Sequence, residues 1–170
     1  ESHEYLVSFF GANNVKKDTY HFSDTESKTC SILFPNTSDQ AVFIWEDDGN
    51  WRRLSFILIS GLLSTNEANR YSGSFGQNRW MLKNGIYPGM RIGDLLKLNA
   101  NDFEFYGKES EYTYMVEPKV TGNINFKWIG VGLNCFNCDR SEIVEHAKVR
   151  ATDAVRNDLA LHVSYIMLKP

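Results

Sequence analysis

Carboxylate pairs, one or two residues apart, are the first groups in this 170-residue chain that could do chemistry. They are Asp47 with Asp48, Asp102 with Glu104, and Glu109 with Glu111. Glycoside hydrolysis needs two carboxyl groups that face each other across a cleft, about 5 to 10 Å apart. We expect Asp48 to serve a turn and the other carboxylates to face solvent, where charged side chains usually lie. A glycoside hydrolase-like enzyme, or another hydrolase with paired carboxylates, is therefore the alternative function.

Other catalytic signatures are missing from the sequence. The stretch Gly73-Ser74-Phe75-Gly76 has Ser72 where a nucleophile elbow requires glycine. The sequence has no Gly-x-x-x-x-Gly-Lys to hold phosphates and no His-Glu-x-x-His to hold a catalytic metal. The four histidines, His3, His21, His146 and His162, are scattered, and each is expected to be a surface or a hydrogen-bonded side chain. We expect no cofactor and no catalytic residue.

The Cys-x-x-Cys motif at Cys135 and Cys138 fits half of a zinc ribbon, a redox pair or a small structural disulfide. A structural zinc needs four ligands, but the chain has no second Cys-x-x-Cys and no His-x-His, and His146 is the only imidazole near the motif. A thioredoxin-type pair belongs inside a βαβ unit, which the flanking pattern does not resemble. We therefore favour structural cysteines, with a disulfide as one form, and expect no metal. Cys30 lies in a strand-like run and should pack as a small apolar side chain.

Aromatic and arginine side chains near turns are the candidates for a binding surface. Trp51 and Trp80 each lie beside arginines, and exposed rings can stack on a sugar or a peptide. Residues 61–77 show no periodicity, and loops of this length are uncommon unless they are functional or mobile. The ligand-binding candidates are Trp51, Arg52, Arg70, Tyr71, Phe75, Trp80 and Tyr87. Trp45 and Trp128, by contrast, are expected in the core.

The composition describes a compact domain and excludes several partners. Hydrophobic residues make up 42% and aromatic residues 14%, against 23% charged residues, so the chain is not disordered. The net charge is −3, and the sequence has no cluster of lysines and arginines that could bind a phosphate backbone. Nucleic acid is therefore not expected as a partner. The longest apolar run is too short and too interrupted for a transmembrane segment. Because the chain begins at Glu1, we expect a mature form whose signal segment was removed, or a trimmed N-terminus.

An Asp-Gly turn between two β-prone runs predicts a hairpin and its register. If Asp48-Gly49 form the centre of a type I′ turn, both residues take positive φ, and counting outward pairs Trp45 with Arg52. The expected core face consists of Ala41, Phe43, Trp45, Leu54 and Phe56. Because side chains alternate along a strand, Trp51 falls on the opposite face. Trp51 is therefore predicted to be an exposed ring.

Short β-prone runs separated by turn residues fill most of the chain. We predict strands at 4–10, 19–23 and 28–34, a hairpin over 40–60, and strands at 79–82, 103–107, 112–116, 123–133 and 159–168. Helical spacing of apolar residues predicts one short helix near 91–98, after a type II turn at Pro88-Gly89. Residues 141–155 fit a helix or a strand, and we favour the strand. The predicted fold is mainly β, α+β at most, a single antiparallel β-sandwich or barrel in one domain over 1–170.

A Gly-Ile turn, a short helix ending in Leu-Asn and a Phe-x-Phe-x-Gly strand follow one another in residues 84–107. This order resembles a pattern in uncharacterised secreted proteins and lipoproteins of Bacteroides-type bacteria, and Phe34-Pro35-Asn36-Thr37 and Ile44-Trp45-Glu46-Asp47 fit it too. The resemblance implies a secreted, periplasmic or cell-surface location and no particular activity. The start of the helix, with Met90, Ile92 and Asp94, also resembles small outer-membrane assembly lipoproteins and the β-lactamase-inhibitor-like fold.

These observations together favour a non-enzymatic, exported or cell-envelope domain that binds a partner. The partner would be a glycan, a peptide or an envelope protein, bound through the loop at 61–77 and the neighbouring turns. An exposed aromatic plane would favour this function, and two carboxylates facing across a deep pocket would favour the hydrolase.

Overall fold

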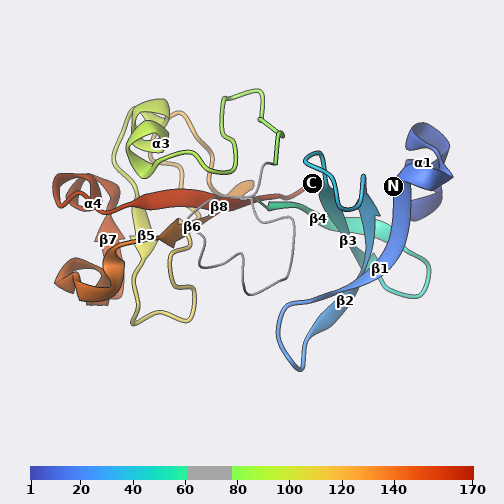
Figure 1. Cartoon of the computed structure of the whole chain (residues 1–170), viewed down its shortest axis with the longest axis horizontal. Coiled ribbons are helices and arrows are strands. Elements are labelled where there is room, and N and C mark those ends of the chain that lie inside the picture. Colours follow the sequence, from blue (N-terminus) through green and yellow to red (C-terminus); the bar gives the residue numbers. More distant parts are fainter. Residues whose placement is uncertain (61–77) are drawn as a thin grey trace.

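The computed structural model describes residues 1–60 and 78–170. Its long strands are β1 (Val15–His21), β2 (Ser27–Leu33), β3 (Ala41–Asp47), β4 (Arg52–Ser60), β6 (Ile129–Cys135) and β8 (Leu161–Leu168). They form one antiparallel sheet in the order β1-β2-β3-β4-β8-β6 (Figure 1). Two short strands, β5 (Glu104–Tyr106) and β7 (Lys148–Arg150), form a separate antiparallel pair. The predicted mainly β class is confirmed, and the sheet is open rather than closed into a barrel.

Helices lie at both ends of this elongated arrangement. Helix α1 (His3–Phe10) lies at the end formed by β1 to β4, and α3 (Ile92–Asn99) and α4 (Ala151–Arg156) lie at the other end with β5 and β7 (Figure 1). The 3₁₀ segments within residues 1–60 and 78–170 are η1 (Ala12–Asn14), η2 (Cys138–Arg140) and η3 (Glu142–Glu145). None of the helices in the described ranges is long and apolar enough to cross a membrane.

The predicted strand at 4–10 is wrong, because these residues form α1. The Ser2 hydroxyl accepts a hydrogen bond from the Tyr5 N–H at 3.2 Å and caps the first turn. Leu6 and Phe10, four residues apart, lie on one helical face and pack in the cluster that contains Trp45. The apolar run that reads as a strand is therefore a helix that covers the sheet.

The hairpin of β3 and β4 exists, but its predicted turn and register are wrong. Asp47 pairs with Arg52, so the loop has four residues, and Trp45 pairs with Leu54 rather than with Arg52. The Asn50 N–H donates to the Asp47 carbonyl oxygen at 3.3 Å, and the positive φ occurs at Trp51 (48°) instead of at the Asp-Gly pair. Hairpin loops of four residues, most often built around a type I turn, are a common alternative to the two-residue type I′ loop.

Among the residues that the structure describes, buried apolar side chains form three clusters against the sheet. The largest lies at the end with α3, α4, β5 and β7 and includes Leu95 and Phe105. A second cluster lies under α1 and contains Trp45, with Trp51 packed against it. A third cluster, with Cys30, lies on the other face of β2 and β3, and Cys30 is only 1% exposed, as predicted for a small apolar side chain. The prediction that Trp45 and Trp51 occupy opposite faces is wrong.

The helix predicted near 91–98 is confirmed as α3, and the side chain of its last residue, Asn99, holds the segments that follow. The Asn99 side chain is fully buried, and its amide N–H groups donate to the Asn101 carbonyl at 2.7 Å and the Thr121 hydroxyl at 3.1 Å. Its amide oxygen accepts from the Ile124 N–H at 3.0 Å. The tight turn before α3 is also confirmed, with Gly89 at a φ of 95°.

Several other segments differ from their predictions. Residues 79–82 form no strand, and residues 112–116 and 123–128 contribute turns and isolated bridges only. Residues 141–155 divide into η3, β7 and α4, so the favoured single strand is wrong. Trp128 is 57% exposed rather than in the core, because it lies in the turn before β6, where its N–H donates to the Asn125 carbonyl.

Candidate functional site

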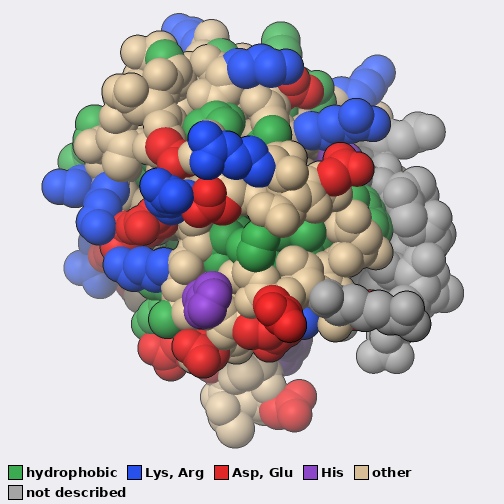
Figure 2. Space-filling model, turned by 90° about the vertical axis from the view of Figure 1, so that its left-hand side faces the viewer, with side chains coloured by type: hydrophobic (Ala, Val, Ile, Leu, Met, Phe, Trp, Pro, Cys, Tyr) green, Lys and Arg blue, Asp and Glu red, His purple; other side chains and the backbone are tan. Residues whose placement is uncertain are grey.

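A cleft opens at the end of the molecule where α3, α4 and the start of β8 meet. Its volume is about 440 Å³. The lining residues are Arg91, Ile92, Gly93, Asp94, Lys97, Asn137, Val155, Asp158, Leu159, Ala160, Leu161 and His162. Figure 2 looks at this end of the molecule, where apolar side chains lie at the surface between Lys, Arg, Asp and Glu side chains. We refer to this cavity as the cleft, and to residues 158–160 as the cleft wall.

The segment before α3 positions one side of the cleft. Gly89 donates its N–H to the Val163 carbonyl at 2.7 Å, and Val163 donates back to the Met90 carbonyl at 2.8 Å. Arg91 forms an antiparallel bridge with His162, so the first turn of α3 starts beside β8. The strand and the helix that meet at the cleft are therefore about 70 positions apart in the sequence.

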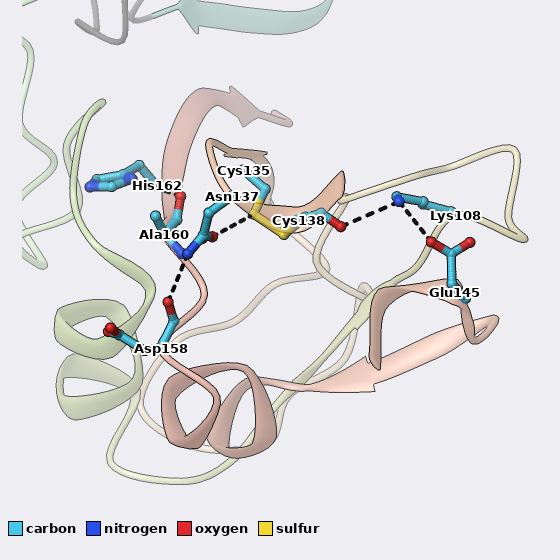
Figure 3. The surroundings of a disulfide bond; sticks show 8 residues. All are labelled: Lys108, Cys135, Asn137, Cys138, Glu145, Asp158, Ala160 and His162. Carbon is cyan, nitrogen blue, oxygen red and sulfur yellow. Dashed lines mark hydrogen bonds and ion pairs between the residues drawn. A yellow bond between two sulfur atoms is a disulfide. The ribbon is translucent and has the colours of Figure 1, made fainter. Parts of the chain in front are cut away.

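The cleft wall forms the opposite side and follows directly from the end of α4. The Leu159 N–H donates to the Ala154 carbonyl at 3.0 Å, which ties the wall to α4. Asp158 adopts a positive φ of 51°, a conformation that asparagine and aspartate tolerate better than most residues. The Asn137 amide donates to the Asp158 carbonyl at 3.0 Å, and its oxygen accepts from the Ala160 N–H at 2.7 Å (Figure 3). Asn137 lies between the two cysteines of a disulfide.

The polar groups of the cleft carry both signs of charge. Arg91 immediately precedes α3 and Lys97 lies on it, and the Lys97 ammonium pairs with Asp94 at 3.0 Å. Asp158 is an exposed carboxylate on the cleft wall. The His162 ring hydrogen-bonds the Ala160 carbonyl at 3.2 Å through Nδ1, which must carry the hydrogen because a carbonyl only accepts. The cleft therefore offers donors, acceptors and charges around an apolar floor of Val155, Leu159 and Leu161.

The two carboxylates of the cleft do not resemble a glycosidase pair. Asp94 and Asp158 are both exposed to solvent, and Asp94 is already paired with Lys97. A carboxyl group that serves as a general acid at neutral pH lies in an apolar pocket. This geometry favours ligand binding over acid–base chemistry in the cleft.

Two of the carboxylates singled out in the sequence, Asp48 and Asp102, bind neighbouring backbone and threonine groups. The Asp48 carboxylate accepts from the Thr29 N–H at 3.1 Å and from the Thr29 hydroxyl at 3.0 Å. Asp102 accepts from the Thr152 N–H at 3.1 Å and also binds the Thr152 hydroxyl, at the start of α4. Glu109 and Glu111 are exposed. Over residues 1–60 and 78–170, no three His, Cys, Asp or Glu side chains gather as a metal site.

The aromatic candidates do not form one surface within the described part of the chain. Trp51 packs under α1, with the Lys17 ammonium 4.1 Å from its ring centroid. Trp80 donates its indole N–H to the Asp39 carbonyl at 2.7 Å, on the loop between β2 and β3. Tyr87 lies on the turn before α3 and is 41% exposed. A common platform that includes Trp51 is therefore wrong, and binding by Trp80 or Tyr87 individually stays a prediction.

The remaining sequence candidates are Arg52, Arg70, Tyr71 and Phe75. Arg52 is exposed at the start of β4, at the other end of the sheet from the cleft. Arg70, Tyr71 and Phe75 lie outside the described residues. The cleft residues were missed because they come from four separate segments. The turn at Pro88-Gly89 and the asparagine inside the Cys-x-x-Cys motif were the only local signals of its position.

A scan against protein-family models and searches of curated proteins and of solved structures found no match for this chain. The cleft is therefore interpreted from its geometry and chemistry alone.

Proposed function

We propose that this protein is a non-enzymatic, exported or cell-envelope binding domain, and that the cleft is its ligand site. The observation that carries the proposal is the cleft itself, about 440 Å³ in volume, with an apolar floor and a polar rim. Ligand sites in proteins commonly have volumes of about 300 to 1,000 Å³, with apolar walls and a few polar groups that orient the ligand. The ligand is a short segment of a glycan or a peptide.

The proposed location outside the cytoplasm has two supports. Disulfides form and persist in oxidising compartments and are rare in the cytosol, and Cys135 and Cys138 are disulfide-bonded. The sequence pattern over residues 84–107 resembles secreted proteins and lipoproteins of Bacteroides-type bacteria. A binding domain on the cell surface or in the periplasm agrees with both.

Glycan and peptide arrays probed with the purified protein test this function, followed by calorimetric titration of each ligand that binds. Val155→Ser removes apolar surface from the cleft floor, and Lys97→Ala removes a cation from the rim. We expect each substitution to weaken binding about tenfold, which corresponds to about 1.4 kcal/mol. Trp80→Ala is measured in parallel, because that ring is a candidate binding residue at a different place.

Two matched variants serve as controls. Val120→Ser and Lys127→Ala replace exposed residues of the same types outside the cleft, and we expect them to bind like the wild type. Binding that survives both cleft substitutions contradicts the proposal, as does loss of binding in Trp80→Ala alone. Arrays on which neither a glycan nor a peptide binds also contradict it. Release of hydrolysed glycan during these titrations would instead support the hydrolase.

A further inference from the structure

The disulfide lies next to the cleft, in a loop whose two ends are held independently of the sulfur–sulfur bond. Cys135 ends β6 and pairs with Leu161 of β8 in the sheet. Cys138 begins η2 and is buried, and its carbonyl oxygen accepts from the Ser141 N–H at 3.1 Å and from the Lys108 ammonium at 3.4 Å (Figure 3). Opening the disulfide therefore leaves both ends in place and frees only the two residues between them.

Those two residues bind the cleft wall. The Phe136 N–H donates to the Ala160 carbonyl at 3.2 Å. The Asn137 amide makes the two further hydrogen bonds to the wall, to the Asp158 carbonyl and from the Ala160 N–H. Figure 3 shows the Asn137 side chain directed at Asp158 and Ala160 from within the loop that the disulfide closes. The position of the cleft wall thus depends on a side chain that the disulfide constrains.

We propose that the Cys135–Cys138 disulfide is a redox-controlled latch that holds the cleft wall in its binding position. A dithiol reductant releases Asn137 from the wall, and residues 158–160 then lose their two hydrogen bonds to the Asn137 amide and keep their bonds to α4 and to the Phe136 N–H next to β6. This inference rests on the proposed function, because the wall is one side of the proposed ligand site. It gives that function a regulation: the oxidised protein binds and the reduced protein binds more weakly.

The reaction is an ordinary thiol–disulfide exchange. A thiolate of the dithiol attacks Sγ of Cys135, the less buried of the two cysteines, and Cys138 leaves as a thiolate that takes up a proton. The second thiol of the reductant, as its thiolate, then displaces Cys135, which is protonated in turn. Two electrons and two protons pass to the protein, and the reductant leaves as its own disulfide.

Amide hydrogen exchange measured by NMR tests the latch without any ligand. We expect the Ala160 N–H to exchange at least about tenfold faster after treatment of the native protein with dithiothreitol. The Val163 N–H of β8, which donates to the Met90 carbonyl, should exchange at an unchanged rate. Alkylation under native conditions should then label the partly exposed Cys135 thiol, which is not free before reduction. Cys30 should stay unlabelled, because burial raises the pKa of its thiol to about 12.

Two variants complete the experiment. Asn137→Ala keeps the disulfide but lacks the amide, and the Cys135→Ser/Cys138→Ser double variant lacks the disulfide. Both should show fast Ala160 exchange in the absence of reductant, and neither should respond further to dithiothreitol. An array ligand, once found, should bind at least about fivefold more weakly to the reduced wild type.

Three results would overturn the latch. They are a native disulfide that dithiothreitol does not reduce, an Ala160 exchange rate that reduction does not change, and an equal acceleration of Val163 that shows general unfolding. A ligand that binds both redox states equally overturns the regulation. A complete lack of ligands counts against the proposed function and not against the wall movement, since the exchange measurement stands by itself.

Discussion

The buried hydroxyl of Ser31 joins a tryptophan of the sheet to a histidine of α1. Its oxygen accepts from the Trp45 indole N–H at 2.9 Å and lies 2.9 Å from Nδ1 of His3. A hydroxyl has one hydrogen and two lone pairs, so the Ser31 side chain can bond the indole and the imidazole at the same time. Burial and the Lys17 charge lower the His3 pKa, against an opposing effect of Glu4. The contact between α1 and the sheet therefore uses a neutral imidazole.

This network predicts a pH dependence of stability. Because the pKa of His3 is lower in the folded protein than its ordinary value of 6.5, the unfolded chain binds more protons in acid. The contribution of His3 to the free energy of unfolding should be complete above pH 6.5 and should decrease as the pH falls below it. Urea unfolding of the wild type and of His3→Gln, at pH 7.5 and pH 5.0, measures this contribution. Equal losses in the two proteins on acidification would show that His3 has no such role.

At the scale of elements, close backbone approaches place β5 and β7 beside the rest of the core. The Gly107 N–H donates to the Ala147 carbonyl at 3.1 Å, and the Lys108 N–H donates to the Val144 carbonyl at 2.7 Å. A Cβ at Gly107 would overlap the carbonyl oxygen of His146 and lie 2.6 Å from that of Val144. Gly107 thus allows the segment after β5 to pack against the chain that leads into β7.

Gly107→Ala should therefore destabilise the protein by about 3 kcal/mol, since the two backbone segments must separate to admit a methyl group. Gly49→Ala is the matched control, because the nearest atom to its Cβ would be 3.9 Å away and its φ is not in the left-handed region. That control should change the free energy of unfolding by no more than about 1 kcal/mol, through the entropy of the unfolded chain. Chemical denaturation compares the two, and equal stabilities would refute the packing argument.

Element boundaries were predictable where local chemistry decides them. Pro88-Gly89 specifies its turn through one fixed φ and one freely positive φ, and α3 follows with apolar residues at helical spacing. The segment 4–10 was mispredicted because its apolar residues fit either period, and only the sheet beneath α1 selects the helix. The Asp48-Gly49 turn was mispredicted because a type I turn accepts the same two residues as a type I′ turn.

At the scale of the whole molecule, the two ends are joined by the central strands. Phe43 of β3 packs against both the cluster under α1 and the large cluster at the cleft end. Strand β4 pairs with β3 along most of its length and with β8 at its C-terminal end. If either end unfolded together with the central strands, the core of the other end would be exposed to water. We therefore expect the whole chain to unfold as one cooperative unit.

Scanning calorimetry tests that expectation. A single two-state transition should give equal calorimetric and van't Hoff enthalpies, of about 120 kcal/mol near 60 °C for a chain of this length. Two resolved transitions, or a van't Hoff enthalpy near half the calorimetric value, would mean that the ends unfold independently. The chain would then consist of two cooperative units instead of one.

The amino-acid sequence by itself determined the mainly β class, the last strand (predicted at 159–168 and found at Leu161–Leu168), the helix after Pro88-Gly89 and the apolar packing of Cys30. Each depends on interactions between residues that are neighbours in the chain, or on burial that a composition of this kind imposes. Tertiary structure alone decided that Trp51 packs beside Trp45 and that Asn137 holds the cleft wall. The cleft combines segments near residues 91, 137, 155 and 160, and such contacts depend on how β6, β8 and α3 meet in space. No local sequence pattern specifies the contacts among β6, β8 and α3, because each segment can pack against several partners until the sheet is assembled.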